Sequence, residues 1–452
     1  MFSRVLVANR GEIAVRVIRA LHELGIEAVT VYSTADEQAL HVRLADRAVK
    51  IGPPPAAQSY LSTPAIVAAA TTTGCEAVHP GYGFLSENAD FVRTCEENDL
   101  VFIGPPADVM ERMGDKALAK LEMRAAGVPL VPGTEGAASL AEAGAAADEL
   151  GYPVLLKAAA GGGGRGMRLV RGPDELEAAY SRASAEAEAA FSDGTLYVEK
   201  AITPARHVEI QVLCDAHGNV LTCGERECSI QRRHQKLIEE SPSPALDAEL
   251  REAMESAAER ACVHIGYRNA GTFEFLVGPD GTFSFIELNA RLQVEHPVTE
   301  LVTQLDLVRL QLAVAAGETL PLSGRAPCSG HAIEIRVNAE DPARGFAPAP
   351  GRLERFRPPL GPGVRVDTFV EDGTVIPPYY DSLIAKVIVR DETRAACIER
   401  ARRVLRELDI RGLPTTREAA FEILGSDEFR SGDYSTSFIE EAGAKLPALA
   451  GA

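Results

Sequence analysis

Two acidic residues and a run of alternating polar side chains between residues 272 and 295 could bind a metal ion and a small oxyanion. Glu274 and Glu287 lie on either side of the turn sequence GPDG, so an antiparallel hairpin would place their carboxylates nearly opposite each other. Every second residue after Glu287 is polar, namely Asn289, Arg291, Gln293 and Glu295. If this segment stays extended, at ~3.3 Å per residue, these side chains share one face over roughly 26 Å.

The residue types on this face favour phosphoryl transfer. Carboxylate and amide oxygens suit Mg²⁺, which binds through one or two carboxylates together with substrate phosphates. Glu274, Glu287 and Asn289 are therefore candidate metal ligands. The guanidinium of Arg291 beside them suits a small oxyanion. The alternative is an ordinary antiparallel strand whose polar side faces water.

Four consecutive glycines lie between two segments that are typical of strands. The glycines are Gly161, Gly162, Gly163 and Gly164, preceded by YPVLLKA and followed by MRLV. A helix begins only past Pro173, so the glycines do not open a helix as an NAD-linked oxidoreductase would require, and no Walker sequence follows them. We expect a mobile hairpin that closes over phosphates, with Lys157 on the strand leading in; a flexible surface loop is the alternative.

Composition limits the classes of partner. The 452 residues include 46 Lys and Arg against 65 Asp and Glu, a net charge of −19 without a long basic run. This argues against nucleic acid and against an anionic membrane surface as partners. The eight cysteines form no Cys-x-x-Cys pair, and neither a signal peptide nor an apolar run of membrane length is found, so we expect reduced thiols and a cytoplasmic location.

A local positive cluster is nevertheless present in the sequence QRRHQK. It contains Arg232, Arg233, His234 and Lys236. Such a cluster could bind phosphate groups, or it could be a basic loop that neutralises nearby glutamates.

The order of the expected elements predicts mixed α/β and α+β architecture. Residues 4–105 alternate short apolar strands with amphipathic helices, which is typical of a doubly wound parallel sheet. The loop 79–88, HPGYGFLSEN, should lie at the carboxyl end of a strand, where ligands meet such sheets, with Ser86 as the cap of the next helix. A helical linker carries Lys116, and strands predominate from residue 202 onward, which indicates an antiparallel sheet.

Long specific strings in the chain resemble biotin carboxylase, a member of the ATP-grasp superfamily. In chain order they are LVANRGEIAVRVIRA, HPGYGFLSEN, MGDK, GGGGRGM, RHVEIQV, QRRHQK, IELNARLQVEHPVTE, RVNAEDP and PPYYDSLIAK, which together span nearly the whole sequence. The resemblance implies a three-part architecture with a Rossmann-like domain over residues 1–113, a helical linker over 114–129, a lid over 130–201 and an antiparallel-sheet body over 202–452. It also implies ATP- and bicarbonate-dependent carboxylation of biotin at N1′ through carboxyphosphate, the first half-reaction of a biotin-dependent acyl-CoA carboxylase.

The resemblance further implies roles for individual residues. ATP phosphates would be held by Lys116, Lys157 and the amides of Gly161, Gly162, Gly163 and Gly164. The rest of the nucleotide pocket would comprise Met167, Glu199, Lys200, Ile202, His207, Gln231, His234 and Leu276. Mg²⁺ or Mn²⁺ would be held by Glu274, Glu287 and Asn289. Bicarbonate would bind to Arg291, Gln293 and the backbone of Val294, and Glu295 would take its proton. Lys236 would neutralise carboxyphosphate, and Arg336 would steady the enolate form of biotin.

Two departures from the family pattern concern the lid and the biotin. The residue before Gly161 is Ala160 where the family often has a fifth glycine, and the extra methyl group should slow lid closure without abolishing it. No Met-Lys pair marks a biotin attachment site, so we expect biotin to arrive on a separate biotin carboxyl carrier protein. We also expect a homodimer that works with a carboxyltransferase subunit. The alternatives are an ATP-grasp ligase with another acceptor and a silent ATP-binding regulatory protein.

Overall fold

The computed structural model describes residues 1–134, 138–158, 167–443 and 445–449. The predicted lid glycines Gly161 to Gly164, with Ala160 before them, lie outside the described residues. No helix within the described ranges is both long enough and apolar enough to cross a membrane.

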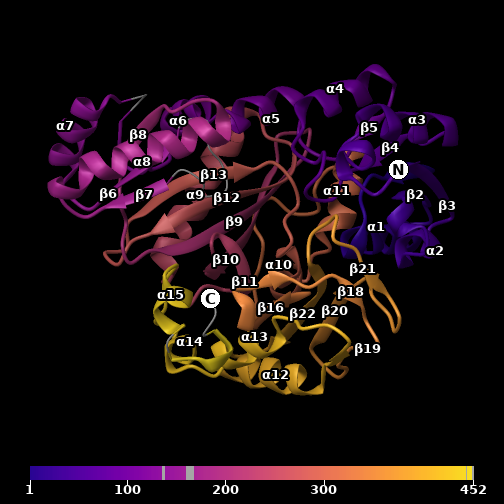
Figure 1. Ribbon diagram of the computed structural model, residues 1–452. Coiled ribbons are helices and arrows are strands. Elements are labelled where there is room, and N and C mark those ends of the chain that lie inside the picture. The colour runs from indigo at the N-terminus through magenta and orange to yellow at the C-terminus, as the bar shows by residue number, and fades with distance from the viewer. Residues whose placement is uncertain (135–137, 159–166, 444, 450–452) are drawn as a thin grey trace.

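A five-stranded parallel sheet forms the N-terminal part of the chain, as predicted (Figure 1). Its strands, in spatial order, are β3 (Arg47–Gly52), β2 (Glu27–Ser33), β1 (Arg4–Val7), β4 (Ala77–His79) and β5 (Val101–Phe102). The accompanying helices are α1 (Gly11–Glu23), α2 (Leu40–Leu44), α3 (Thr63–Thr73) and α4 (Ala89–Glu97). Ile13, Val17 and Leu21 form the buried stripe of α1, because residues spaced by three and four positions share one helix face.

The structure corrects two local expectations in this part. Asn88, not Ser86, caps α4, since the Asn88 side chain accepts a hydrogen bond from the Phe91 amide. The edge strand β3 was not predicted; half of its residues are exposed, and Arg47 and Lys50 are charged. Such a strand lacks the apolar alternation by which strands are recognised.

Two helices follow β5, namely α5 (Ala107–Gly114) and α6 (Lys116–Ala125), and α6 lies within the predicted helical linker. The Asp115 carboxylate caps α6 by accepting hydrogen bonds from the amides of Ala117 and Leu118, so Lys116 lies in the first turn of that helix.

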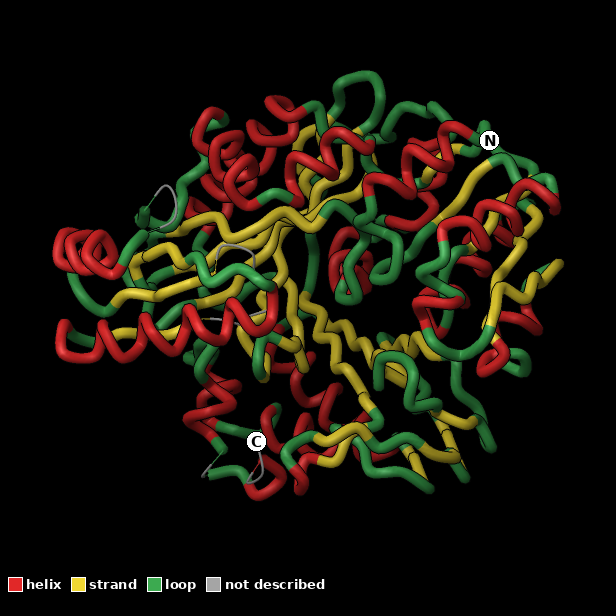
Figure 2. Tube along the Cα trace, turned by 45° about the horizontal axis from the view of Figure 1, so that its top comes forward, coloured by secondary structure: helices red, strands yellow, loops and turns green. Residues whose placement is uncertain are grey.

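The predicted lid contains a small antiparallel sheet with two helices. The strands lie in the order β7 (Met167–Val170), β6 (Val154–Ala158) and β8 (Leu196–Lys200), and the helices are α7 (Leu140–Leu150) and α8 (Pro173–Phe191). The strand pair on either side of the glycines is antiparallel, with Lys157 opposite Met167. Both views place this unit at the end of the molecule farthest from the N-terminal sheet (Figures 1 and 2).

A nine-stranded sheet forms the body of the molecule, in agreement with the predicted fold class. Its main path is β13 (Phe283–Asn289), β12 (Asn269–Val277), β9 (Arg206–Cys214), β10 (Val220–Arg232), β11 (Gln235–Ser241), β15 (His331–Asn338), β22 (Leu383–Asp391) and β20 (Val364–Thr368), and β14 (Gly324–Arg325) pairs with β10. All neighbours are antiparallel except β10 and β14. Short two-stranded sheets pair β16 (Glu340–Asp341) with β17 (Ala347–Pro348), β18 (Gly351–Arg352) with β21 (Val375–Ile376), and β19 (Arg355–Arg357) with β23 (Asp409–Arg411).

Helices complete the body. They are α9 (Ala248–Ile265), α10 (His296–Thr303), α11 (Leu307–Ala315), α12 (Arg394–Glu407), α13 (Arg417–Ile423), α14 (Asp427–Ser431) and α15 (Phe438–Ala442). Because β11 and β15 are neighbours, the strand that carries Lys236 lies beside the strand that carries Arg336.

Candidate active site

The hairpin of β12 and β13 brings the two predicted metal carboxylates face to face. Glu274 pairs with Glu287 in the strand register, as predicted, and a bulge follows at Phe275. The Oε1 atom of Glu274 accepts hydrogen bonds from Asn289 Nδ2 and Gln293 Nε2, each at 2.7 Å. Glu287 remains accessible to solvent, although the protein around it and the Glu274 carboxylate raise the pKa of Glu287.

The expected extended conformation beyond Asn289 is wrong. β13 ends at Asn289 and α10 begins at His296, with Pro297 in the first helical turn. The intervening residues form a turn, which we call the substrate loop (residues 290–295), and Glu295 at its end has φ −81° and ψ 8°. Alternation on a flat strand therefore does not bring the polar side chains together; contacts with other strands do.

Lys236 forms ion pairs with three carboxylates in the site. Its Nζ lies 2.7 Å from Glu295 Oε1 and 3.2 Å from Glu274 Oε1, and it also pairs with Glu209 on β9. Burial disfavours the charged lysine, but these carboxylates outweigh burial and raise the pKa of Lys236. Burial also opposes ionisation of Glu295, yet the charge of Lys236 lowers the pKa of Glu295. Glu295 is thus held as a carboxylate, the form a general base requires.

Arg336 on β15 binds the second oxygen of Glu295. Its Nη2 lies 2.9 Å from Glu295 Oε2 and 2.5 Å from Glu239 Oε1. Glu239 is fully buried, and this burial raises the pKa of Glu239 to about 7 despite the arginine. The two cations, Lys236 and Arg336, therefore fix one oxygen each of Glu295.

The N-terminal part of the chain contributes a residue that the sequence analysis did not identify. Glu87, from the loop HPGYGFLSEN, accepts a hydrogen bond from Arg291 Nε at 2.8 Å and another from the Ala290 amide at 3.0 Å. Arg291 also donates from Nη2 to Asn289 Oδ1 at 2.9 Å. The position of the loop at the carboxyl end of β4 was the available signal, but nothing local indicated its partner.

A further buried cation supports the substrate loop. Lys386 on β22 is completely buried and donates to the carbonyl oxygen of Val294 at 2.9 Å. It also forms ion pairs with Glu12 of α1 at 2.9 Å and with Asp367 of β20 at 3.9 Å. The loop is thus attached to the N-terminal sheet region through Glu87 and to both α1 and β22 through Lys386.

A cavity of about 470 Å³ lies between the N-terminal loop and the body. Three predicted substrate residues line it, namely Arg291, Val294 and Arg336. Tyr82 and Gly83 from the loop HPGYGFLSEN also line it, together with Tyr380 and Gln235. The cavity combines arginine side chains with aromatic surface, which suits a planar polar ligand beside an anion.

Basic side chains gather on the lid side of Glu287. Lys157 Nζ lies 2.5 Å from Glu199 Oε2, and Lys120 Nζ, which was not predicted, lies 2.6 Å from Oε1 of the same carboxylate. Burial and the charge of Lys157 lower the pKa of Lys116, so these two predicted phosphate ligands are close enough to repel each other. The carboxylates of Glu287 and Glu199 act against this and favour a higher pKa of Lys116.

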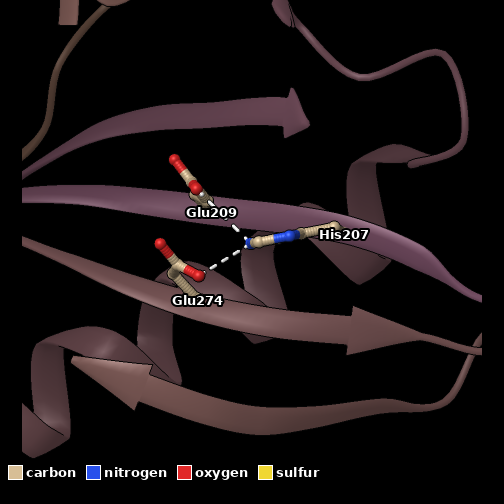
Figure 3. A group of neighbouring side chains, drawn as sticks. All are labelled: His207, Glu209 and Glu274. Carbon is tan, nitrogen blue, oxygen red and sulfur yellow. Dashed lines mark ion pairs between the residues drawn. The ribbon is translucent and has the colours of Figure 1, made fainter. Parts of the chain in front are cut away.

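His207 lies between two acidic residues rather than facing open space (Figure 3). Its Nε2 is 2.9 Å from Glu274 Oε2 and 3.4 Å from Glu209 Oε1. Burial opposes protonation, but the Glu274 carboxylate prevails and raises the pKa of His207 to about 9. In the structure this trio therefore forms an ion-pair cluster, with the imidazole between the two carboxylates.

The other predicted nucleotide residues are spread around these groups. Leu276 pairs in register with His207 across β12 and β9. Lys200 donates to the carbonyl oxygens of Gly151 at 2.7 Å and Tyr152 at 3.3 Å, within the lid. Gln231 lies near the end of β10, His234 lies in the turn between β10 and β11, and Ile202 follows β8. The basic residues of the sequence QRRHQK do not stay together. Arg232 donates a hydrogen bond to the Gly345 carbonyl oxygen, whereas Lys236 forms an ion pair with Glu295.

Known families match consecutive parts of the chain. Residues 1–110 match "Biotin carboxylase, N-terminal domain", residues 115–323 match "Carbamoyl-phosphate synthase L chain, ATP binding domain", and residues 334–441 match "Biotin carboxylase C-terminal domain".

Named relatives match along nearly the whole length. The biotin carboxylase of Nostoc sp. is 53% identical over 97% of this chain and 99% of its own. A pyruvate carboxylase subunit of Methanothermobacter thermautotrophicus is 51% identical over 98% of this chain and 90% of its own. The biotin carboxylase domain of Hydrogenobacter thermophilus 2-oxoglutarate carboxylase, solved as a dimer with MgADP, ADP and bicarbonate, has a TM-score of 0.92 and 49% identity over 98% of each chain. The chain therefore belongs to the biotin carboxylase family, and the reaction it catalyses is the ATP-dependent carboxylation of biotin.

Proposed function

We propose that Glu295 is the general base that takes the proton of bicarbonate and so starts the reaction. The observation that carries this proposal is the pair of cations on its two oxygens, Lys236 and Arg336, which keeps a buried carboxylate ionised. Bicarbonate is a weak nucleophile, so proton removal in a fixed geometry lowers the barrier to attack on the γ-phosphate. One bicarbonate oxygen forms the new bond to phosphorus, ADP leaves, and carboxyphosphate is the product of this step.

Arg291, Gln293 and the backbone of Val294 bind bicarbonate in this proposal. All three belong to the substrate loop, which Glu87 and Lys386 hold in place. Lys236 neutralises the carboxyphosphate, and Arg336 stabilises the negative charge that develops on the ureido oxygen of biotin when N1′ loses its proton. The cavity beside Arg291, Val294 and Arg336 offers the space for the biotin rings.

Glu274 and Glu287 fit a divalent cation such as Mg²⁺ or Mn²⁺. The two residues are paired in the strand register, and burial together with the charge of Glu274 raises the pKa of Glu287, an effect that a shared cation would oppose. Asn289 is a third candidate ligand, although its Oδ1 accepts a hydrogen bond from Arg291. When bound, the cation neutralises charge on the phosphoryl oxygens.

We place the nucleotide between the lid and the body. Lys116 and Lys157 bind its phosphates, with the amides of Gly161 to Gly164 from the lid. The remaining residues of the pocket are Met167, Glu199, Lys200, Ile202, His207, Gln231, His234 and Leu276. Binding of the phosphates would draw Lys157 from its ion pair with Glu199. The domain limits at residues 113, 129 and 201 belong to the same proposal.

We further propose that biotin arrives on a separate carrier protein, that a carboxyltransferase subunit completes the reaction, and that the enzyme is a cytoplasmic homodimer. The dimeric state of the Hydrogenobacter domain supports the last point. Two of the relatives named above belong to a pyruvate carboxylase and a 2-oxoglutarate carboxylase, so the final acceptor is a property of the transferase.

ADP release measured with and without bicarbonate and free biotin tests the proposal. We expect hydrolysis of ATP to require bicarbonate and to accelerate when biotin is added. ATP hydrolysis that does not depend on bicarbonate or biotin, but is accelerated by an amine or another carboxylate, would identify a ligase with a different acceptor. ATP binding without turnover would identify a regulatory protein.

A further inference from the structure

Arg226, which neither the sequence motifs nor the proposed mechanism uses, lies directly behind the substrate loop. Its side chain extends from β10 and is completely buried, with 0% of its surface exposed. A guanidinium has five N–H groups, and each of the five has an acceptor here. The acceptors and their distances are Glu209 Oε2 at 3.2 Å, Gln211 Oε1 at 2.7 Å, Thr299 Oγ1 at 3.0 Å, Thr272 Oγ1 at 3.0 Å and Gln293 Oε1 at 2.7 Å.

The contact with Gln293 decides which end of that amide faces the substrates. A guanidinium can only donate hydrogen bonds, so the carboxamide oxygen of Gln293 must point toward Arg226. The NH₂ group then points the opposite way, and it donates to Glu274 Oε1 at 2.7 Å. The hydrogen bonds to Arg226 and to Glu274 both require this orientation of the Gln293 amide, because an ionised carboxylate can only accept a hydrogen bond.

We propose that Arg226 is a positioning residue for bicarbonate, which it serves by holding the Gln293 amide with its N–H donors turned into the site. The inference rests on the proposed binding of bicarbonate by Gln293. Without the guanidinium, the amide is free to rotate, and rotation would present its oxygen to the bicarbonate anion and to the Glu274 carboxylate. Arg226 also binds Glu209, and Glu209 pairs with Lys236. Arg226 is therefore connected to Gln293 directly and to Lys236 through Glu209.

A double-mutant cycle between Arg226 and Gln293 tests this role, with the KM for bicarbonate and the KM for ATP measured separately. Arg226→Lys retains a charge for Glu209 but loses the planar set of five donors. We expect it to raise the KM for bicarbonate about tenfold while the KM for ATP changes less than about twofold, since one charge-assisted hydrogen bond is lost. Gln293→Glu, which removes the donors themselves, should raise the KM for bicarbonate at least as much.

The double variant Arg226→Lys with Gln293→Glu should have the same KM for bicarbonate as Gln293→Glu alone, because the donors that Arg226 orients are then absent. Thr272→Val is the matched control: it removes a different acceptor of Arg226, and the KM for bicarbonate should stay within about twofold. If the lysine variant fails to fold, as judged by its melting temperature, Arg226→Gln replaces it with the same expected result.

The outcomes separate this inference from the proposed function. An unchanged KM for bicarbonate in Gln293→Glu would remove Gln293 from the bicarbonate site, and the proposed function would need revision at that residue. A raised KM in Gln293→Glu together with an unchanged KM in Arg226→Lys, equal rises in both KM values, or additive effects in the double variant would overturn the role of Arg226 alone.

Discussion

Lys236 and Glu295 form a buried ion pair in which Nζ lies 2.7 Å from Oε1, with the side chains 11% and 2% exposed. Burial alone would favour the neutral acid, but the lysine charge lowers the pKa of Glu295. Arg336 binds the other oxygen at 2.9 Å. The Glu295 carboxylate, the proposed base, therefore has both oxygens fixed by cations in the structure.

Replacement of Lys236 should weaken Glu295 as a base and should also remove the positive charge that neutralises carboxyphosphate. In Lys236→Met, the largest charge that offsets the burial of Glu295 is lost and only the arginines remain, so the pKa of Glu295 rises and less carboxylate is present at neutral pH. We expect kcat to fall on the order of 100-fold, as when one electrostatic donor is removed from a site. The acid limb of the kcat/KM profile should also move to higher pH. A uniform loss of rate at every pH would show that Lys236 does not control the ionisation of Glu295.

Glu87 should affect bicarbonate through Arg291. Because the Glu87 side chain is 40% exposed, its ion pair with Arg291 is worth little, and Glu87→Gln should raise the KM for bicarbonate by only about two- to fivefold. The KM for ATP should not change. Glu96→Gln, an exposed position on α4, is the matched control. If both variants behave alike, the N-terminal loop has no part in bicarbonate binding.

Loss of one metal carboxylate should appear in the Mg²⁺ dependence. Glu287→Gln leaves Glu274 and the Lys236 cluster in place. The Mg²⁺ concentration that gives half-maximal ATP hydrolysis should rise at least ~10-fold, since changes near a metal site commonly cost that much affinity. Glu318→Gln, also exposed, serves as control. An unaltered Mg²⁺ requirement in Glu287→Gln would exclude this residue as a ligand.

Stability should depend on pH through Glu240, which has no assigned role in the reaction. Glu240 is buried, but His331 and Arg394 outweigh burial and lower the pKa of Glu240 to about 2. A carboxyl whose folded pKa lies below its unfolded value stabilises above the unfolded pKa, and this stabilisation is lost as the pH falls toward the folded pKa.

The Glu240→Gln variant should therefore unfold more easily at pH 7, by about 3 kcal/mol. The difference from the wild type should shrink as the pH falls below about 4.5 toward 2. Urea denaturation across that range measures it, and Glu37→Gln, an exposed site, is the reference. A difference that stays constant with pH would mean that the ion pairs of Glu240 do not contribute to stability.

The sequence predicted those features of the site that depend on local pattern. The turn GPDG and the alternation around it determined the pairing of Glu274 with Glu287, because strand register follows from turn position and side-chain period. The parallel sheet was predicted from the alternation of apolar strands with amphipathic helices, and the antiparallel sheet from the predominance of strands after residue 202. The sequence motifs that resemble biotin carboxylase indicated the carboxylation of biotin.

Other features depend on contacts between segments far apart in the chain. The substrate loop was expected to be extended because its polar residues alternate, yet the strand ends at Asn289 and α10 begins at His296, with Pro297 in its first turn. Glu87 lies 204 residues from Arg291, and Lys386 lies 92 residues from Val294. No local pattern reports such pairings, so these supporting residues were found only in the structure.

The most direct measurement is the rate of bicarbonate-dependent ADP release, with and without free biotin, in the wild type and in Glu295→Gln. The substitution keeps the size of the side chain but removes its capacity to accept a proton. We expect Glu295→Gln to lose biotin-stimulated turnover by about 100-fold or more, the contribution typical of a general base, while the KM for ATP is retained. A variant that hydrolyses ATP at the wild-type rate in the presence of bicarbonate and biotin would contradict the assignment of Glu295 as the base.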